Sequence, residues 1–136
     1  MKQVFHTIHV PTHGPGLYEV TNRLADFLRE MNDGLVTCFI RHTSASLLIQ
    51  ENADPDVQKD LQDFFAQLAR NGMDYRHTEE GPDDMPSHIR SALTQTSLAI
   101  PVRGGKPALG TWQGLYVFEH RDAPHRREVL FHYMGD

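Results

Sequence analysis

The stretch Glu128-Val-Leu-Phe-His-Tyr-Met134 decides the fold class of this chain. Its apolar residues alternate along the sequence, and a period of two residues is typical of a β-strand. The two faces of the predicted strand carry Val129, Phe131 and Tyr133 on one side and Leu130, His132 and Met134 on the other. Because both faces are partly apolar, we expect this strand to lie between two layers of the molecule.

Six further short segments with apolar character are also predicted to be strands. They cover residues 4–10, 17–20, 35–40, 45–50, 97–102 and 115–119. We expect Pro11 to end the first of them, because it is followed by the turn-forming stretch His13-Gly14-Pro15-Gly16. The stretch Arg103-Gly104-Gly105-Lys106 is predicted to be a hairpin turn.

Three segments carry helix signals. Residues 22–31 follow Thr21, which can cap a helix, and place apolar residues at the spacing of one helical face. Residues 55–70 begin at Asp54-Pro55, where aspartate caps the helix and proline fits its first turn. A shorter helix is expected over residues 86–93. Strands outnumber these two main helices and one short helix and cluster late in the chain, which favours a largely antiparallel α+β fold.

Length and composition limit the classes of protein to consider. With 136 residues the chain has room for a single domain, residues 1–136. Its net charge of −5 argues against general binding of nucleic acid, and no apolar run approaches the ~20 residues of a membrane span. The single cysteine, Cys38, lies in an apolar strand and no signal peptide follows Lys2, so we expect a cytoplasmic protein.

The first polar cluster lies between two apolar strands, at Arg41-His42-Thr43-Ser44-Ala45-Ser46. At neutral pH a histidine in this position can act as a general base or as a metal ligand. The hydroxyl groups and backbone amides beside it can hold an anion. The alternative interpretation is a tight turn whose hydroxyl side chains bond to the backbone.

Two further clusters contain carboxylates. Glu51 and Asn52 stand at the end of a predicted strand, where side chains commonly enter a site, although a solvated connection explains them equally well. Asp84 and His88 are four residues apart, so on a helix they would share one face. His77 precedes them in an acidic loop. No short metal-binding motif is present, so His42, His77 and His88 could ligate zinc only if the fold gathers them.

The only tryptophan, Trp112, lies in Gly110-Thr111-Trp112-Gln113-Gly114. Glycine permits the close approach of a ligand or another chain, and tryptophan is common at protein interfaces. Together with the late strands that are apolar on both faces, this motif indicates a homo-oligomer. The alternative is that Trp112 plugs the core beside a turn.

Four stretches together resemble the YjbQ-like family, whose members are labelled secondary thiamine-phosphate synthase enzyme. They are residues 42–46, residues 51–55, residues 81–86 with His88, and Gly110-Thr111-Trp112-Gln113. The resemblance covers nearly the whole chain. It implies a compact domain with strands in two layers, assembled as a homotrimer. The labelled activity joins a pyrimidine diphosphate to a thiazole phosphate.

The residues and the resemblance together predict a polar cleft that both His42 and His88 face. The expected catalytic residues are His42, His88, Glu51 and Asp84. The expected ligand-binding residues are Arg41, Thr43, Ser44, Ser46, Asn52, Trp112, Gln113 and Glu119. The expected metal ligands are His42, His88 and His77, with zinc preferred over magnesium. We expect an enzyme acting on a small anionic or phosphorylated compound, the alternative being a trimer that binds a ligand or metal without catalysis.

Overall fold

The computed structural model describes all residues from Met1 to Asp136, arranged as two antiparallel sheets and three helices. The larger sheet contains, in spatial order, β1 (Lys2–His13), β8 (Pro124–Gly135), β3 (Gly34–Ile40), β5 (Ser97–Arg103) and β6 (Lys106–Pro107). The smaller sheet contains β2 (Gly16–Glu19), β7 (Gln113–Glu119) and β4 (Ala45–Glu51). Every neighbouring pair of strands is antiparallel, which confirms the predicted α+β fold class.

The hydrophobic core lies between the two sheets. Its buried residues come from alternate positions of the strands and include Val36, Cys38 and Ile40 of β3, Val129, Phe131 and Tyr133 of β8, and Leu115 and Val117 of β7. One helix, α1 (Thr21–Leu28), closes this core with Leu24 and Leu28, both of which are fully buried. The alternating pattern that predicted β8 therefore buries the Val129 face, in a strand flanked by β1 and β3.

Two boundary predictions were wrong at the N-terminal end. β1 continues through Pro11 to His13, because β1 is an edge strand and a proline there need not sacrifice a ladder hydrogen bond. Thr21 does not cap α1 from outside. It is the first helical residue, its hydroxyl donates to Glu19, and the same oxygen accepts from the backbone N–H of Leu115. These contacts tie α1 to the small sheet.

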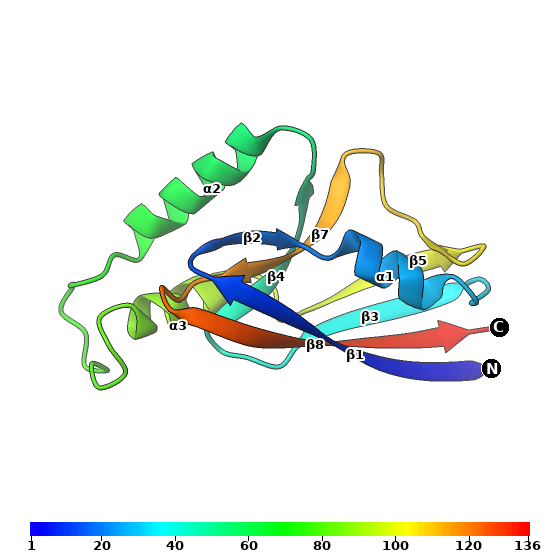
Figure 1. Cartoon of the computed structure of the whole chain (residues 1–136), viewed down its shortest axis with the longest axis horizontal. Helices are drawn as coiled ribbons and strands as arrows, with labels where there is room; N and C mark the ends of the chain where they lie inside the picture. Colours follow the sequence, from blue (N-terminus) through cyan, green and yellow to red (C-terminus); the bar gives the residue numbers. More distant parts are fainter.

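The other two helices cover the outer side of the small sheet, and both lie toward the left in Figure 1, away from the two termini. α2 (Pro55–Leu68) begins as predicted, with Asp54 accepting from the backbone N–H of Asp56. α3 (Asp84–Leu93) begins two residues earlier than predicted. No helix is long and apolar enough to cross a membrane.

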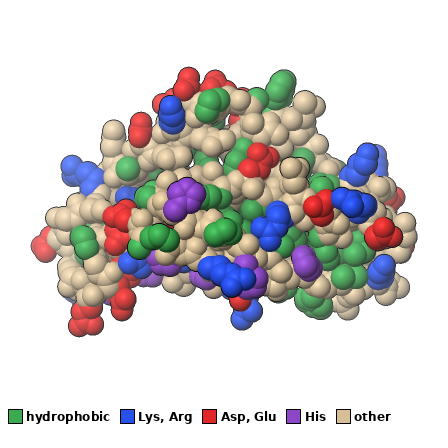
Figure 2. Space-filling model, in the orientation of Figure 1, with side chains coloured by type: hydrophobic (Ala, Val, Ile, Leu, Met, Phe, Trp, Pro, Cys, Tyr) green, Lys and Arg blue, Asp and Glu red, His purple; other side chains and the backbone are tan.

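α2 contacts the small sheet loosely. The Phe65 ring meets Phe118 of β7 edge to face, at 5.5 Å between centroids, but no residue of α2 is fully buried. Its outward side is acidic, because Asp56, Asp60 and Asp63 are all exposed, and red side chains gather along this upper edge in Figure 2.

The outer face of the large sheet carries exposed apolar side chains. Leu35 of β3 pairs with Met134 of β8, and each is about two-fifths exposed. Phe39 and Phe5 lie on the same face, and the Phe5 ring stacks on His132 at 4.3 Å. The sheet is therefore apolar on both faces, although only its inner face meets the core of this chain.

Candidate metal centre

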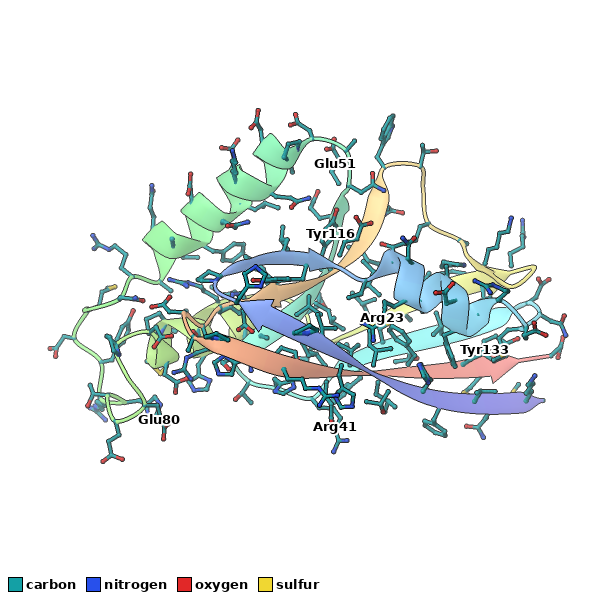
Figure 3. The ribbon with its side chains drawn as sticks, in the orientation of Figure 1. Arg23, Arg41, Glu51, Glu80, Tyr116 and Tyr133 are labelled. Atoms are coloured by element: carbon teal, nitrogen blue, oxygen red, sulfur yellow. The ribbon has the colours of Figure 1, made fainter.

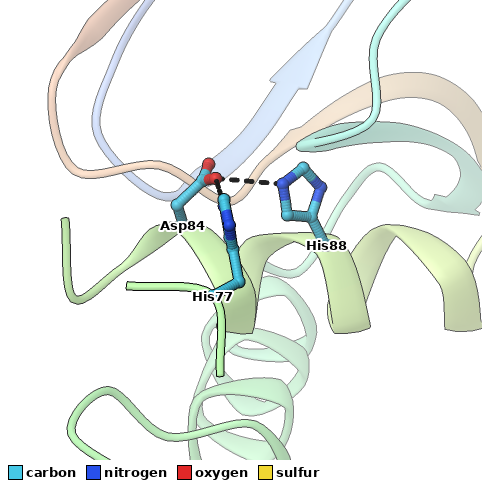
Figure 4. A group of neighbouring side chains, drawn as sticks. All are labelled: His77, Asp84 and His88. Carbon is cyan, nitrogen blue, oxygen red and sulfur yellow. Dashed lines mark hydrogen bonds and ion pairs between the residues drawn. The ribbon is translucent and has the colours of Figure 1, made fainter. Parts of the chain in front are cut away.

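The early start of α3 brings three side chains together at its first turn. Asp84 and His88 lie one helical turn apart, and His77 reaches back from the preceding loop. The Nε2 atoms of His77 and His88 lie 2.7 and 3.0 Å from the same carboxylate oxygen, Oδ2 of Asp84. Figure 4 shows both rings directed at that carboxylate. One ligand atom from each residue lies within 4.8 Å of the others.

The tautomer of His88 is set by a backbone contact. Its Nδ1 lies 2.8 Å from the carbonyl oxygen of Thr43, so Nδ1 carries the proton and donates it. In the neutral ring, Nε2 then presents a lone pair to the carboxylate of Asp84. Two lone pairs at 3.0 Å repel each other unless a proton or a cation lies between them. A histidine fixed through Nδ1 by a carbonyl is also the usual arrangement of a metal-bound imidazole.

The second oxygen of Asp84 is held from the other side. Nη1 of Arg121 donates to Oδ1 at 2.7 Å, and Nε of the same guanidinium donates to Asp83 at 2.9 Å. Burial by itself raises the pKa of Asp84. The hydrogen bond from His77 and the charges of His88 and Arg121 outweigh it and keep that pKa below its usual range. Asp84 is therefore a carboxylate with one oxygen anchored and the other offered to the two rings.

The three side chains differ in their access to solvent. Asp84 is 6% exposed, whereas His77 and His88 are 41% and 31% exposed, so a small molecule can reach the cluster from the imidazole side. His88 also lines a pocket of about 300 Å³ together with His42, Thr43 and Ser91. The Ser91 hydroxyl is buried and has no hydrogen-bond partner. His77 lines a separate pocket of about 250 Å³ formed by the loop.

His42 shares the pocket with His88, as the sequence predicts, but its ring nitrogens are used differently. Nε2 of His42 accepts a hydrogen bond from the backbone N–H of Glu128 at 2.7 Å. Burial, and then the charge of Arg127, lower the pKa of His42, so the ring is neutral with its proton on Nδ1. Neither nitrogen joins the His77–Asp84–His88 cluster. The group that the structure brings together is thus His77, Asp84 and His88, with the Asp84 carboxylate in place of the predicted third histidine, His42.

The predicted anion-binding hydroxyls point into the interior. Ser44 Oγ and its carbonyl oxygen accept from Arg127, and Ser46 Oγ lies 2.9 Å from Nε2 of His120. Glu119 of β7 is fully buried and accepts from Arg127 and Thr12. Both hydroxyls therefore meet interior side chains, neither bonding to the backbone of the turn nor facing an open anion site. Thr43 stays exposed at the pocket, and Arg41 pairs with Glu128 at 3.3 Å on the surface.

The remaining predicted residues lie at the far end of the small sheet. In the β4–β7 register, Glu51 is opposite Gln113, six pairs from the Ala45–Glu119 end that adjoins α3. At ~3.3 Å per residue these ends are about 20 Å apart. Figure 3 shows Glu51 beside the start of α2, well away from Glu80 in the loop before α3. Asn52 donates to the Gln113 carbonyl oxygen and Trp112 is exposed, so this end is a second polar surface.

Arg121 and Ser91 are site residues that the sequence analysis missed. Arg121 follows the Glu119-His120 end of β7, and its side-chain contacts with Asp83 and Asp84 at the start of α3 bring it to the site. Ser91 is the third residue after His88 on α3. The one local signal for Ser91 is this helical spacing, which places it on the same side as His88.

Comparison with known proteins identifies the family. Residues 6–136 match the family described as "UPF0047 protein YjbQ-like". The chain belongs to the YjbQ/UPF0047 family. It is 52% identical to UPF0047 protein sll1880 of Synechocystis over 93% of this chain and 88% of that protein. It is 43% identical to UPF0047 protein YjbQ of Escherichia coli O157:H7 over 87% and 85% of the two chains.

Solved structures of similar proteins share the fold. The chain superposes on the conserved hypothetical protein TT1486 of Thermus thermophilus with a TM-score of 0.87, at 32% identity, over 95% of this chain and 99% of that one. A YjbQ/UPF0047 protein of Clostridium acetobutylicum gives a TM-score of 0.84 at 31% identity, over 96% and 99%. The two-sheet architecture is thus that of the family.

Proposed function

We propose that this YjbQ/UPF0047 protein binds a divalent cation through His77, Asp84 and His88 and acts there on a small anionic or phosphorylated compound. One observation carries the proposal. Nδ1 of His88 lies at the Thr43 carbonyl oxygen, and in the neutral ring the bare Nε2 then faces a carboxylate oxygen that the His77 ring also approaches. A cation between these three atoms removes the repulsion and uses each lone pair.

The donor set favours zinc over magnesium. Two imidazole nitrogens and one carboxylate oxygen suit zinc, whereas magnesium prefers oxygen ligands and retains several waters. Zinc bonds of ~2.0–2.2 Å to three protein atoms leave a fourth position open, which is the pattern of catalytic rather than structural zinc sites. The exposure of both imidazoles supports an open position on that side.

A cation in this place would supply positive charge to an oxygen of the substrate. The chain would supply the surroundings: Thr43 and Ser91 line the pocket beside His88, and Ser91 offers an unused hydroxyl. In the family's labelled reaction, pyrophosphate leaves a pyrimidine diphosphate, and a leaving group of that charge requires cationic stabilisation. The free, buried Cys38 fits a cytoplasmic location for such chemistry.

We also propose that the chain works as a homotrimer. The outer face of the large sheet supports this, because Phe5, Leu35, Phe39 and Met134 form an exposed apolar surface that the chain itself does not cover. Surfaces of this kind are commonly buried between subunits. Trp112, 63% exposed at the far end of the small sheet, is a second candidate contact. Sedimentation at micromolar concentration tests this, and a stable monomer would contradict it.

Metal analysis tests the cation site directly. We expect about one zinc per chain in protein loaded with zinc and then dialysed. His77→Ala and His88→Ala each should weaken zinc binding at least ~10-fold. His13→Ala is the matched control, because His13 is exposed, makes no ion pair and lies more than 60 residues before His77 in the sequence. Equal zinc content in wild type and His88→Ala would contradict the proposed site.

A turnover assay then separates the enzyme from a non-catalytic binding trimer. Pyrophosphate release from the pyrimidine diphosphate and thiazole phosphate pair is measured with wild type and with His88→Ala at equal trimer content. Loss of turnover in the variant supports an enzyme. If wild type binds zinc but releases no pyrophosphate above the uncatalysed rate, this reaction is excluded and the binding trimer becomes the better proposal.

A further inference from the structure

A second cavity lies on the other side of α3, between this helix, α2 and the end of β7. Its volume is about 260 Å³, and ten residues line it, only two of them hydrophobic. The polar lining includes Gln62, Arg70, Asn71, Arg90, His120 and Asp122. Neither His77, Asp84 nor His88 belongs to it. On a helix, Arg90 is ~200° around the axis from His88, which puts it on the opposite face of α3.

Arg90 brings an unused donor to this cavity. The residue is only 9% exposed, and its Nη2 donates to the carbonyl oxygen of Ala69 at the end of α2. Its Nε–H is buried and has no hydrogen-bond partner. A buried donor of a charged group that has no acceptor destabilises the fold, because it has lost its hydrogen bonds to water and gained none in return. A ligand that accepts from this N–H would remove that cost.

His120 brings a second unmatched nitrogen. It is 1% exposed, and burial together with the charge of Arg90 lowers its pKa to about 3, so the ring is neutral. Its Nε2 lies 2.9 Å from Oγ of Ser46, and its buried Nδ1 has no hydrogen-bond partner. When Ser46 donates to Nε2, the ring proton is on Nδ1 and this atom is also a donor. The residues that line the cavity therefore bring the Arg90 donor and, in that tautomer, a second donor from His120.

The charges around the cavity favour an anion. Arg70 and Arg90 are cationic and Asp122 is anionic. Glu119 also lines the cavity, but its carboxylate is already neutralised by the buried Arg127. One net positive charge remains, beside the unmatched Nε–H of Arg90, which only an acceptor can satisfy. The carboxamides of Gln62 and Asn71 add donors at the rim.

We propose that this cavity binds a small oxyanion, a phosphate or carboxylate group, through Arg90, His120 and Arg70. Guanidinium groups match the geometry of both kinds of oxyanion, and charge-assisted hydrogen bonds of this type are strong. The cavity holds an anionic group of a few heavy atoms but not a nucleotide. This site is separate from the cation site of the proposed function and would stand without it.

Calorimetric titration of the full-length protein with inorganic phosphate, and separately with acetate, tests the site. We expect saturable binding of at least one of the two anions, and the comparison tells phosphate from carboxylate. Arg90→Gln should weaken binding about 10-fold, and Arg70→Gln about 3-fold. Arg103→Gln, an exposed cation of the β5–β6 turn, is the matched control and should change nothing.

Two further arms keep the result interpretable. Arg70 is exposed, so the Arg70→Gln variant should fold even if Arg90→Gln does not. In the wild-type protein, the ring resonances of His120 should shift when the anion is titrated in. His88→Ala should bind the anion as wild type does. The proposal is overturned if no anion binds below ~10 mM, if Arg70→Gln and Arg90→Gln bind normally, or if His88→Ala alone abolishes binding, which would assign the anion to the cation site.

Discussion

The His77–Asp84–His88 cluster and the Arg127–Glu119 network lie near the same end of the small sheet, and each sets a carboxylate against basic side chains. They differ in solvent exposure and in how completely their carboxylate oxygens are hydrogen-bonded. Glu119 is fully buried and Arg127 is 3% exposed, whereas the two imidazoles of the cluster are about one-third exposed or more. In the network, every oxygen of Glu119 meets a donor: Oε1 meets Thr12 and Arg127, and Oε2 meets Arg127 and two backbone N–H groups.

This difference distinguishes a carboxylate that is fully matched within the chain from one that is not. A network in which both oxygens of the buried carboxylate are matched inside the chain gains little from a ligand, and it fixes the turn at Ser44. A cluster in which a neutral His88 presents a lone pair to an anionic oxygen is incomplete without a further positive charge. The four predictions below test this contrast, from the largest expected effect to the smallest.

Breaking the closed network should have the largest effect. Arg127→Met leaves Glu119 buried without its partner, and removing one member of a buried ion pair costs about 3–5 kcal/mol of the free energy of unfolding. Urea denaturation measures the loss. The double variant Arg127→Met with Glu119→Leu removes both charges and should regain most of it. A loss below about 1 kcal/mol for the single variant would show that the network contributes little.

Acid should weaken the network next. Burial raises the pKa of Glu119, but the hydrogen bonds from Arg127 and Thr12 and the charge of Arg127 bring it below the usual range. A depressed pKa in the folded state means that its stabilisation is present above ~pH 4.3 and is lost as the pH falls toward the folded value. His120 acts in the same direction from about pH 6.5 downward, because its folded pKa is about 3.

Unfolding free energies measured between pH 7 and pH 3 test this. We expect a continuous loss with decreasing pH and a smaller slope below about pH 4.5 in Glu119→Gln, which has no carboxylate to protonate. A profile that is flat over this range, or a slope unchanged by Glu119→Gln, would contradict the assignment.

The sequence was sufficient to predict most of the fold because its signals are local. The alternation around Phe131 predicts β8, and Asp54-Pro55 predicts the start of α2. The errors fall where long-range pairing decides. Pro11 predicts the end of a strand, but β1 continues through it because β1 lies at the edge of its sheet. Thr21 predicts a helix cap, but its hydroxyl oxygen accepts a hydrogen bond from the backbone N–H of Leu115, 94 residues away.

The candidate site was predictable only in part, for the same reason. The four-residue spacing of Asp84 and His88 is a local signal, and the structure places both in one cluster. Which oxygen or nitrogen remains unused depends on partners far along the chain. His42 and His88 are both histidines in polar stretches, but Glu128 occupies Nε2 of one and Thr43 fixes Nδ1 of the other. Sequence spacing contains neither fact.

Exchanging these two histidines for alanine should sharpen the contrast. His88→Ala should lower zinc affinity at least ~10-fold with little change in stability, because the side chain is 31% exposed. His42→Ala should keep the zinc affinity and lower the free energy of unfolding by about 1–3 kcal/mol, because the backbone N–H of Glu128 loses its acceptor. Isothermal titration with zinc and urea denaturation provide the two measurements. Loss of zinc in His42→Ala would place His42 in the cation site.

The smallest effect is expected at the helix start farthest from both clusters. Asp54 caps α2 with a 2.9 Å hydrogen bond from Asp56, whereas Asp83, the equivalent residue of α3, makes no such bond because Arg121 and the backbone N–H of Asp122 occupy its carboxylate. Asp54→Ala should therefore cost about 1 kcal/mol of unfolding free energy and leave zinc affinity unchanged. Asp54→Asn, which keeps a capping oxygen, should cost far less.

Asp83→Asn should instead weaken zinc binding severalfold, because Arg121 then holds Asp84 less firmly. If Asp54→Ala and Asp83→Asn behave alike in both measurements, the two helix starts do the same task and Arg121 has no part in positioning the cation ligands.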